Sequence, residues 1–561
     1  MTSETLVSTD LPPADEAEGV NDVVLTVENL QVQFQRAGRV VHAVKGVDFT
    51  VRRGRTLAII GESGSGKSVS VRSLMGLLPP SARVTGSALL GETQLLGLPE
   101  PEMRRLRGKD IAMVFQNPAT SLNPTMSIGA QLLEAIRMHS RMDKQAATAR
   151  ALELLALVRL RDPEMRLAQY PHQLSGGMRQ RVVIAMALAS DPAVLIADEA
   201  TTALDVTTQA AIMELLCDLQ DRLGMAIILI SHDLALAASY ADAVMVMRHG
   251  AVVEHVRPEL LFDDDRQEYT KELLGAFSTL PTERRAPAAA EGVEPLLRVE
   301  GIVQEFVTRG AGGVRTGIVR AVNDVSFELR PGTTLGIVGE TGSGKSTVAR
   351  AVIQVERAKS GSVVFQGQEL GALKRRALSK VYADMQMIYQ DPFGSLNPRW
   401  RVSEVIAEPL RGHTTMTEKA RSARVDELLD LVGLPPAEYR SRRPQELSGG
   451  QAQRVAIARA VSLEPALIIC DEATSALDVL IQAQILDLLV TLQRDLGMAY
   501  LFIGHDLNVV RYISDDIAVM RHGDLVEYGR SEDVFTNPQH EYTQELLAAI
   551  PTAEPGTRRR R

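Results

Sequence analysis

Two stretches of the chain decide its fold: residues 61–68 read GESGSGKS and residues 339–346 read GETGSGKS. Both match the pattern G-x-x-x-x-G-K-[ST], in which loop amides surround phosphate oxygens, the lysine adds positive charge and the last hydroxyl binds Mg2+. An apolar run precedes each stretch, and a helical pattern begins at each lysine. The sequence therefore predicts two nucleotide sites, each in a strand-loop-helix unit.

The chain repeats itself at a nearly constant spacing. Lys67 and Lys345 are 278 positions apart, and the later motifs recur 273 or 274 positions apart. Such an offset indicates the tandem duplication of one domain. A segment rich in alanine, proline and charge separates the copies and is the expected linker. We expect a first domain at 23–278, a linker at 279–295 and a second domain at 296–550.

Composition excludes several classes of protein. Of 561 residues, 45% are hydrophobic and 23% charged, as in folded globular proteins. The net charge of -9 argues against a nucleic-acid partner. Only Cys217 and Cys470 are present, which excludes a disulfide framework and a cysteine metal cluster. No apolar run reaches about 18 residues, so we expect no membrane-spanning segment.

The two ends of the chain are biased in charge. Residues 1–22 hold six acidic side chains and neither lysine nor arginine, which indicates a solvated acidic tail and not a signal peptide. Residues 551–561 end in four arginines, which form a basic tail. Solvation of that tail is favoured over contact with anionic lipid, because four charges bind lipid weakly.

Further motifs follow each phosphate loop in the same order. An aspartate that ends a strand beside a phosphate loop is placed to hold Mg2+, and a following glutamate can polarise an attacking water. Taken singly, such residues are more often surface or core positions, but their shared order favours catalysis. In the first copy they are Gln116, LSGGM at 174–178, Asp198, Glu199, Asp205 and His232; in the second they are Gln390, LSGGQ at 447–451, Asp471, Glu472, Asp478 and His505.

This ordered set resembles the nucleotide-binding domain of ABC ATPases, and the resemblance covers nearly the whole chain twice. It implies an α/β fold of two tandem P-loop NTPase domains, each with a β-rich arm and a helical subdomain. The first helical insertion is expected at about 127–175. The resemblance also implies ATP and Mg2+ as cofactors and ATP hydrolysis as the reaction.

In that family the signature string of one domain completes the nucleotide site of the other, so the resemblance implies two composite sites. Glu199 and Glu472 would orient the attacking water, and His232 and His505 would contact the γ-phosphate. One site would combine Gly61, Ser63, Gly64, Ser65, Gly66, Lys67, Ser68, Gln116, Asp198, Glu199 and His232 with Ser448, Gly449, Gly450 and Asp478. The other would combine Gly339, Thr341, Gly342, Ser343, Gly344, Lys345, Ser346, Gln390, Asp471, Glu472 and His505 with Ser175, Gly176, Gly177 and Asp205. The implied Mg2+ ligands are Ser68, Gln116 and Asp198 in one site and Ser346, Gln390 and Asp471 in the other.

Two pairs of positions leave alternatives open or depart from the family pattern. Phe34 and Phe306 match the position of the adenine-stacking aromatic, but a core phenylalanine is an equal alternative at either. Met178 stands where the signature usually has glutamine, and Gly504 where serine usually precedes the histidine. We expect the departure at Met178, which lies beyond the signature glycines, to tune its site without loss of function, and we expect both sites to hydrolyse ATP.

A second shared phrase indicates the kind of work. The string Q-[DN]-P-x-x-S-L-N-P occurs at 116–124 and 390–398, and NPQHEYTQELL at 537–547 has a shortened copy, EYTKELL, at 268–274. Both resemble the ATPases of bacterial oligopeptide, dipeptide and nickel importers, here fused as in single-chain glutathione and peptide importers. The implied activity is ATP hydrolysis coupled to peptide uptake.

That resemblance implies partners and a location. Two transmembrane permease subunits would insert short helices near Gln116 and Gln390, and an extracytoplasmic solute-binding protein would deliver the ligand. The chain would then lie at the cytoplasmic face of the inner membrane and contact it through the permeases. Many members hold an iron–sulfur cluster in a cysteine-bearing extension; no cysteine lies between Cys217 and Cys470, so we predict no cluster.

The alternative is a soluble tandem ABC ATPase with a non-transport role. A ribosome-acting protein would need a long charged helical linker, whereas residues 279–295 are short and rich in alanine and proline. A DNA-repair relative would show zinc cysteines or coiled-coil insertions. Sugar importers lack the S-L-N-P phrase. Peptide import is therefore favoured.

Overall fold

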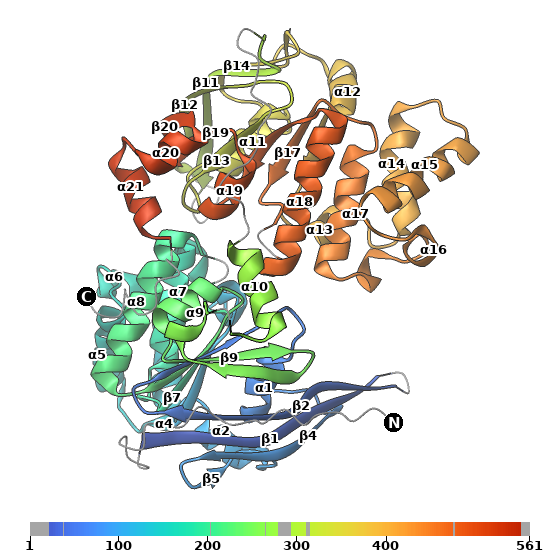
Figure 1. Cartoon of the computed structure of the whole chain (residues 1–561). Coiled ribbons are helices and arrows are strands. Elements are labelled where there is room, and N and C mark those ends of the chain that lie inside the picture. The colour runs from blue at the N-terminus through green and yellow to red at the C-terminus, as the bar shows by residue number, and fades with distance from the viewer. Residues whose placement is uncertain are drawn as a thin grey trace, which may run out of the picture. The chain divides into compact units, whose positions relative to one another are not determined.

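The computed structural model describes residues 22–36, 39–201, 204–263, 265–278, 293–309, 315–474 and 477–550. The chain divides into two compact units between Phe277 and Ser278, and each is described by itself (Figure 1). The predicted basic tail, and almost all of the predicted acidic tail and linker, lie outside the described residues.

The first unit begins with an antiparallel arm sheet of order β2-β1-β4-β5. In β1 the buried side chains alternate at Leu25 and Val27 and again at Leu30 and Val32, with a register shift between Val27 and Leu30. This period of two buries one face of the arm. The strands are β1 Val23–Arg36, β2 Arg39–Arg52, β4 Ala82–Leu90 and β5 Thr93–Gln94.

The core sheet of the first unit has the order β10-β9-β3-β8-β7-β6, and only the edge strand β10 is antiparallel. Its inner strands are apolar and buried on both faces, as is usual for parallel sheets covered on both sides. The strands are β3 Thr56–Ile60, β6 Ile111–Val114, β7 Val194–Asp198, β8 Ala226–Ile230, β9 Ala243–Arg248 and β10 Ala251–Val256.

Two apolar clusters cover the faces of this sheet. In β7, Val194 and Ile196 join the cluster shared with the arm and α1, whereas Leu195 and Ala197 join the cluster formed with α4, α5, α7 and α8. The helices are α1 Lys67–Leu74, α2 Glu100–Leu106, α3 Pro118–Ser121, α4 Ile128–His139, α5 Lys144–Leu157, α6 Pro163–Ala168, α7 Gly176–Ala187, α8 Val206–Leu223, α9 Leu234–Tyr240 and α10 Glu268–Ser278, with short 3-10 turns η2 Pro171–Gln173 and η3 Pro258–Leu260.

The second unit repeats this plan. Its arm sheet has the order β12-β11-β14-β15, and its core sheet the order β16-β17-β18-β13-β19-β20 with β20 antiparallel. The strands are β11 Leu297–Arg309, β12 Arg315–Leu329, β13 Thr334–Val338, β14 Ser360–Phe365, β15 Gln368–Glu369, β16 Met385–Ile388, β17 Leu467–Asp471, β18 Ala499–Ile503, β19 Asp516–Arg521 and β20 Asp524–Arg530.

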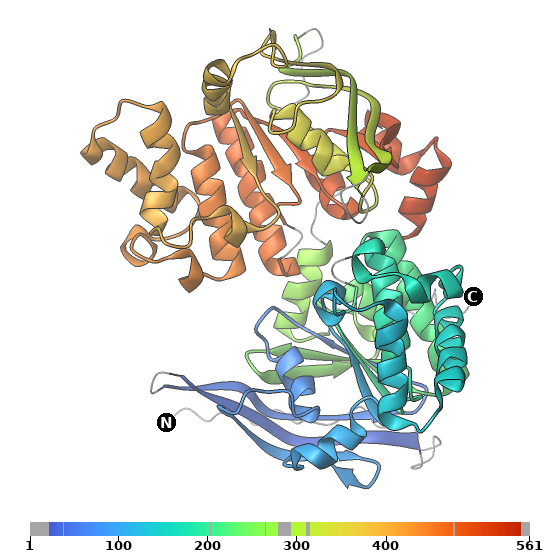
Figure 2. The same ribbon diagram turned by 180° about the vertical axis from the view of Figure 1, so that it is seen from behind.

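The helices of the second unit include a separate lobe, α14 to α16, beside the core (Figures 1 and 2). The helices are α11 Lys345–Val352, α12 Arg375–Asp384, α13 Pro392–Ser395, α14 Val402–His413, α15 Glu418–Leu431, α16 Pro436–Tyr439, α17 Gly449–Val461, α18 Val479–Leu496, α19 Leu507–Ile513, α20 Ser531–Thr536 and α21 Glu541–Ala548, with the 3-10 turn η5 Pro444–Glu446. The predicted α/β class, with arm, core and helical subdomain in each copy, is confirmed.

One packing difference explains the glycine at position 504. A Cβ on Gly504 would lie 2.8 Å from Cγ2 of Val510, and a Cβ on Gly336 would lie 2.4 Å from both Cγ1 of Val510 and Oγ of Ser514. The two glycines therefore leave room for larger side chains on and after α19. At the repeat-related positions, the first unit has Ala58, Ser231, Ala237 and Ala241.

Among the described residues, none of the helices combines the length and apolar character that a membrane crossing requires.

Candidate nucleotide site

The parallel core sheet of the first unit brings the phosphate loop, Gln116, Asp198, Glu199 and His232 to one edge. Strands β3, β6, β7 and β8 run in the same direction, so their carboxyl ends meet there. Asp198 ends β7 and pairs with Ile230, the last residue of β8. His232 therefore follows the next strand at the same level as Asp198. Open α/β sheets bind ligands at this edge.

The phosphate loop after β3 has a backbone that only glycine supports at its two ends. Gly61 has φ 144° and Gly66 has φ 102°. A Cβ at Gly61 would lie 2.1 Å from the carbonyl oxygen of Met247, and one at Gly66 would lie 2.6 Å from that of Ala43. The spacing of glycines in the motif thus reflects close backbone approach as well as positive φ.

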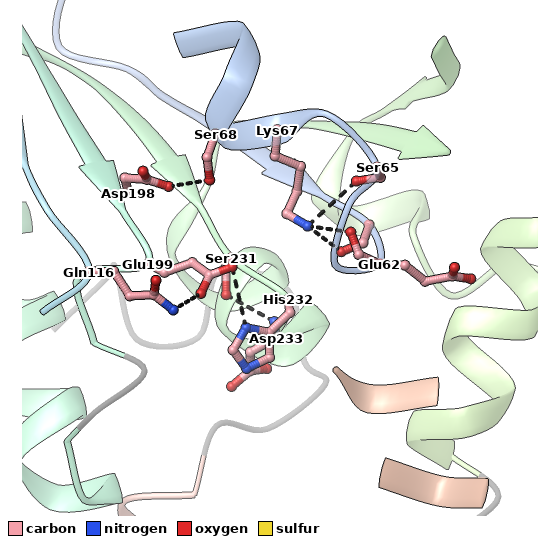
Figure 3. A network of polar contacts seen from close by, with 11 residues as sticks. Glu62, Ser65, Lys67, Ser68, Gln116, Asp198, Glu199, Ser231, His232 and Asp233 are labelled. Carbon is pink, nitrogen blue, oxygen red and sulfur yellow. Dashed lines mark hydrogen bonds and ion pairs between the residues drawn. The ribbon is translucent and has the colours of Figure 1, made fainter. Parts of the chain in front are cut away.

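Lys67 begins α1 and lies inside the loop that precedes it. Its Nζ donates to the carbonyl oxygens of Gly61 at 2.6 Å and Glu62 at 2.7 Å (Figure 3). The second unit repeats this arrangement, with Nζ of Lys345 at 2.7 Å from the Gly339 oxygen and 2.8 Å from the Glu340 oxygen. Each loop therefore holds a buried cation beside its amides.

Burial lowers the pKa of Lys345, and the charge of Glu472 opposes that effect. A partly desolvated ammonium beside loop amides favours an anionic ligand.

A serine and an aspartate face each other across the site. Oγ of Ser68 donates to Oδ1 of Asp198 at 2.7 Å, and Oγ of Ser346 donates to Oδ1 of Asp471 at 2.8 Å. Hydroxyl and carboxylate oxygens are the donors that Mg2+ prefers. Burial raises the pKa of Asp471, while the Ser346 hydroxyl opposes the rise. A cation beside this pair would favour the ionised form.

The glutamate that follows each aspartate has a strained backbone conformation. Glu199 has φ 49° and Glu472 has φ 50°, a left-handed conformation that is unfavourable for non-glycine residues. The amide of Glu199 donates to the carbonyl oxygen of Ile230 at 3.1 Å, which holds this conformation. Strained backbone of this kind is concentrated at functional sites.

The histidine of each unit lies beside the glutamate. Nδ1 of His232 is 3.9 Å from Oε1 of Glu199, and Nδ1 of His505 is 3.5 Å from Oε2 of Glu472 (Figure 3 for the first unit). The contact with His232 lowers the pKa of Glu199 despite the opposing effect of burial. Burial alone would lower the pKa of His505, but Glu472 outweighs it and raises the pKa. In the first unit the carboxylate of Glu199 is thus favoured in its ionised form.

Each signature string forms the start of a helix. Oγ of Ser175 accepts the amide of Met178 at 3.3 Å and caps α7, and Oγ of Ser448 accepts that of Gln451 at 3.4 Å and caps α17. Gln451 also bonds back to Ser448, a capping box that Met178 cannot form.

The second glycine of each signature string is required for packing. A Cβ at Gly177 would lie 2.5 Å from Cγ2 of Thr208, and one at Gly450 would lie 2.5 Å from Cγ2 of Ile481. Both neighbours are β-branched and stiff, so a side chain at the glycine would displace α7 from α8, or α17 from α18.

The remaining predicted residues lie at other places in each unit. Asp478 caps α18 by accepting the amide of Ile481 at 3.1 Å, and Oδ1 of Asp205 accepts the hydroxyl of Thr207 at 2.8 Å. Phe34 is partly buried and packs against the apolar cluster between the arm sheet and the core sheet, whereas Phe306 is 40% exposed. Adenine stacking by either phenylalanine stays a prediction.

Two features of the site were absent from the sequence-based prediction. Arg72, one turn after Ser68 on α1, forms an ion pair with Oδ2 of Asp198 at 3.0 Å. The turn between β9 and β10 supports the phosphate loop, because the amide of Gly250 donates to the carbonyl oxygen of Ser65 at 3.0 Å. Gly523 and Ser343 repeat that bond at 3.0 Å. The repeated His-Gly pairs at 249–250 and 522–523 are the feature of the sequence that could have indicated this turn.

Comparisons with known proteins agree with this geometry. The model of the ABC transporter family matches residues 44–202 and 322–475, and the model of the oligopeptide/dipeptide transporter C-terminal region matches 526–561. The glutathione import ATP-binding protein GsiA of Escherichia coli K12 is 45% identical over 98% of this chain and 92% of its own length. GsiA of Pectobacterium atrosepticum is 46% identical over 96% of this chain and 91% of its own length.

Single ABC cassettes have been solved that match one half of the chain. A dimeric ATP-binding cassette in a post-hydrolysis state, bound to ADP and Pi, is 27% identical over 42% of this chain and 98% of that one, with a TM-score of 0.39.

The fold, the duplicated site and the family matches define a tandem ABC ATPase, and the chain belongs to the ABC transporter family. It binds ATP and hydrolyses it for import. Within that family it is the ATPase of a peptide-group importer, as predicted from the S-L-N-P and YTxxLL phrases.

Proposed function

We propose that this chain energises bacterial uptake of short peptides, with glutathione in the substrate class. The observation that carries the proposal is 45% identity to a glutathione import ATPase across 98% of the chain. The peptide-transporter C-terminal region at 526–561 supports the same class.

The site residues would divide the work of phosphoryl transfer. Loop amides with Lys67 or Lys345 would bind the phosphates, Glu199 or Glu472 would orient water, and the neighbouring histidine would contact the γ-phosphate. The bonds of each glutamate to a glutamine, at 2.6 and 2.7 Å, support this assignment because they fix the carboxylate.

The oxygens of each site fit a bound Mg2+. Ser68, Asp198 and Gln116 would hold it in the first unit, and Ser346, Asp471 and Gln390 in the second. When bound, Mg2+ neutralises charge on the β- and γ-phosphates. We further propose that each signature segment completes the phosphate loop of the other domain, so that one chain carries two composite ATP sites.

Permease partners would dock near the two glutamines. Phe115 beside Gln116 is 38% exposed, and Tyr389 beside Gln390 and Phe393 are 43% and 42% exposed. Apolar side chains at these positions suit short helices of two transmembrane subunits, which would hold the chain at the cytoplasmic face of the inner membrane. An extracytoplasmic solute-binding protein would supply the substrate.

The test is reconstitution of the full chain with two permease subunits and a binding protein in liposomes. Uptake of labelled glutathione or a dipeptide should require ATP on the side of the liposome membrane where this chain is bound. Liposomes that carry the E199Q/E472Q variant should show no uptake. Recovery of ribosomes or DNA in place of membrane proteins after mild detergent extraction would contradict the proposal. An iron and sulfide assay separately tests the predicted absence of a cluster.

A further inference from the structure

A tyrosine in the C-terminal helix of each unit contacts the phosphate loop. The hydroxyl of Tyr269, in α10, accepts a hydrogen bond from the amide of Glu62 at 3.1 Å. The hydroxyl of Tyr542, in α21, accepts one from the amide of Glu340 at 3.1 Å. The side chains are 3% and 1% exposed. These are the tyrosines of the string YTxxLL, which occurs within EYTKELL at 268–274 and within NPQHEYTQELL at 537–547.

An arginine from the neighbouring hairpin holds each tyrosine ring. The guanidinium carbon of Arg248 lies 4.3 Å from the centre of the Tyr269 ring, and that of Arg521 lies 4.6 Å from the Tyr542 ring. Cation–π contacts at this distance are stabilising when partly desolvated. Both arginines end the strand that leads to the turn whose glycine contacts the phosphate loop. Ring and loop are therefore held by the same hairpin.

A glutamate of that hairpin fixes the start of the C-terminal helix. Oε1 of Glu254 accepts the amide of Gln267 at 3.2 Å. Glu527 repeats the contact more fully, because its two oxygens accept the amides of Gln539 at 2.8 Å and His540 at 3.1 Å. Each tyrosine follows two or three residues later. Its position depends on a rigid connection between helix and hairpin, repeated in both units.

The tyrosine and the loop lysine hold opposite ends of one residue. In the first unit the amide of Glu62 donates to Tyr269, while its carbonyl oxygen accepts Nζ of Lys67 at 2.7 Å. A phosphate that attracts Nζ of Lys67 would weaken its bond to the Glu62 carbonyl oxygen and leave the bond between the Glu62 amide and Tyr269 in place. Burial raises the pKa of Tyr269 and of Tyr542 to about 12, so both phenols stay neutral at physiological pH.

We propose that Tyr269 and Tyr542 are positioning residues for ATP binding, which keep the second residue of each phosphate loop in place when the lysine turns to the phosphates. The C-terminal segment then contributes to nucleotide affinity without touching the nucleotide. The proposal depends on ATP binding by this chain and not on the proposed import of peptides.

The experiment compares Y269F/Y542F with the parent full-length chain. Phenylalanine keeps the ring and its arginine contact but removes the hydroxyl. Y500F is a matched control, since the Tyr500 hydroxyl is buried and donates to the Leu489 carbonyl oxygen at 2.8 Å, away from the phosphate loop. Binding of a fluorescent ATP analogue is measured in the E199Q/E472Q background, and KM and kcat are measured in the hydrolysing protein.

We expect the Kd for the analogue and the KM for ATP to rise about three- to tenfold in Y269F/Y542F, the loss of one hydrogen bond per site, while kcat changes less than about twofold. Y500F should lower the thermal stability of the second domain about as much as Y269F/Y542F does, without changing KM. Unchanged Kd in Y269F/Y542F, or an equal rise in Y500F, would overturn the proposal. A parent chain that binds the analogue but imports no peptide would leave it intact.

Discussion

The side-chain amide of Gln116 donates to Oε2 of Glu199 at 2.6 Å, and Gln390 repeats this bond to Glu472 at 2.7 Å. Each carboxylate is thus fixed by a glutamine, a nearby histidine and a left-handed backbone. Three independent constraints on one side chain are what a group that orients water requires.

Replacement of both glutamates by glutamine should reduce kcat for ATP hydrolysis about 100-fold or more, because an amide cannot polarise water as a carboxylate does. ATP binding should persist. Steady-state ATPase rates and analogue binding measure the two effects. If E199Q or E472Q alone kept the parent rate, the altered site would not be in use.

The ion pair between Arg72 and Asp198 should contribute to the stability of the first domain. The Asp198 side chain is 2% exposed, so R72Q would leave a buried carboxylate short of one partner. We expect a loss of about 1–3 kcal/mol in the free energy of unfolding, visible as a lower first-domain transition in calorimetry.

R350Q is the control for that variant. Arg350 occupies the equivalent helix position but forms a longer pair, 3.6 Å, with Glu356. Its loss should lower the free energy of unfolding by less than about 1 kcal/mol. Equal effects of R72Q and R350Q would show that the shorter pair adds no more stability than the longer one.

The glycine at 336 should be replaceable only together with its neighbours. G336A alone should destabilise the second domain by about 1–3 kcal/mol through overpacking against Val510 and Ser514. The triple variant G336A/V510A/S514A, which reproduces the first-domain residues, should regain part of that stability. Calorimetry of the second-domain transition measures both.

Gly412 provides the control for added methyl groups, because a Cβ there would meet nothing within 4 Å. G412A in α14 should leave stability unchanged or raise it by up to about 1 kcal/mol. A triple variant less stable than G336A would show that Val510 and Ser514 are not the source of the crowding.

His255 should make the first domain sensitive to pH. Burial lowers its pKa, despite the opposing charge of Asp48, so the folded domain binds the proton less readily than the unfolded chain. Stability is therefore retained above the unfolded value, about 6.5, and is lost as pH falls below it.

The first-domain transition temperature of H255Q should fall less than that of the parent between about pH 7.5 and about pH 5.5. H42Q, at an exposed position in β2 of the same domain, should follow the parent. Parallel pH profiles for H255Q and the parent would contradict the assignment.

The sequence allowed prediction of the elements whose chemistry is local. Phosphate loops, strand-end acids and signature strings occupy consecutive residues, and parallel strands necessarily bring them to one edge. Arg72 was not predicted, because an arginine on a helix has many possible partners and spacing does not specify which. The contact of Tyr269 with Glu62 joins residues 207 positions apart, so only the fold reveals it. The exchange of Ser231 and Ala237 for Gly504 and Val510 likewise depends on volumes that meet only after folding.

The left-handed backbone at Glu199 and Glu472 lowers the stability of the fold, but it belongs to the residues whose carboxylates ATP turnover requires. Glycine at either position would relieve about 1–3 kcal/mol of backbone strain and remove the carboxylate at the same time. Such a chain would fold, escape proteolysis and accumulate normally while one site stayed inactive. Screens that measure abundance or thermal stability would not distinguish this variant from the parent. Loss of function at these two positions is therefore detected only by an assay that measures phosphate release.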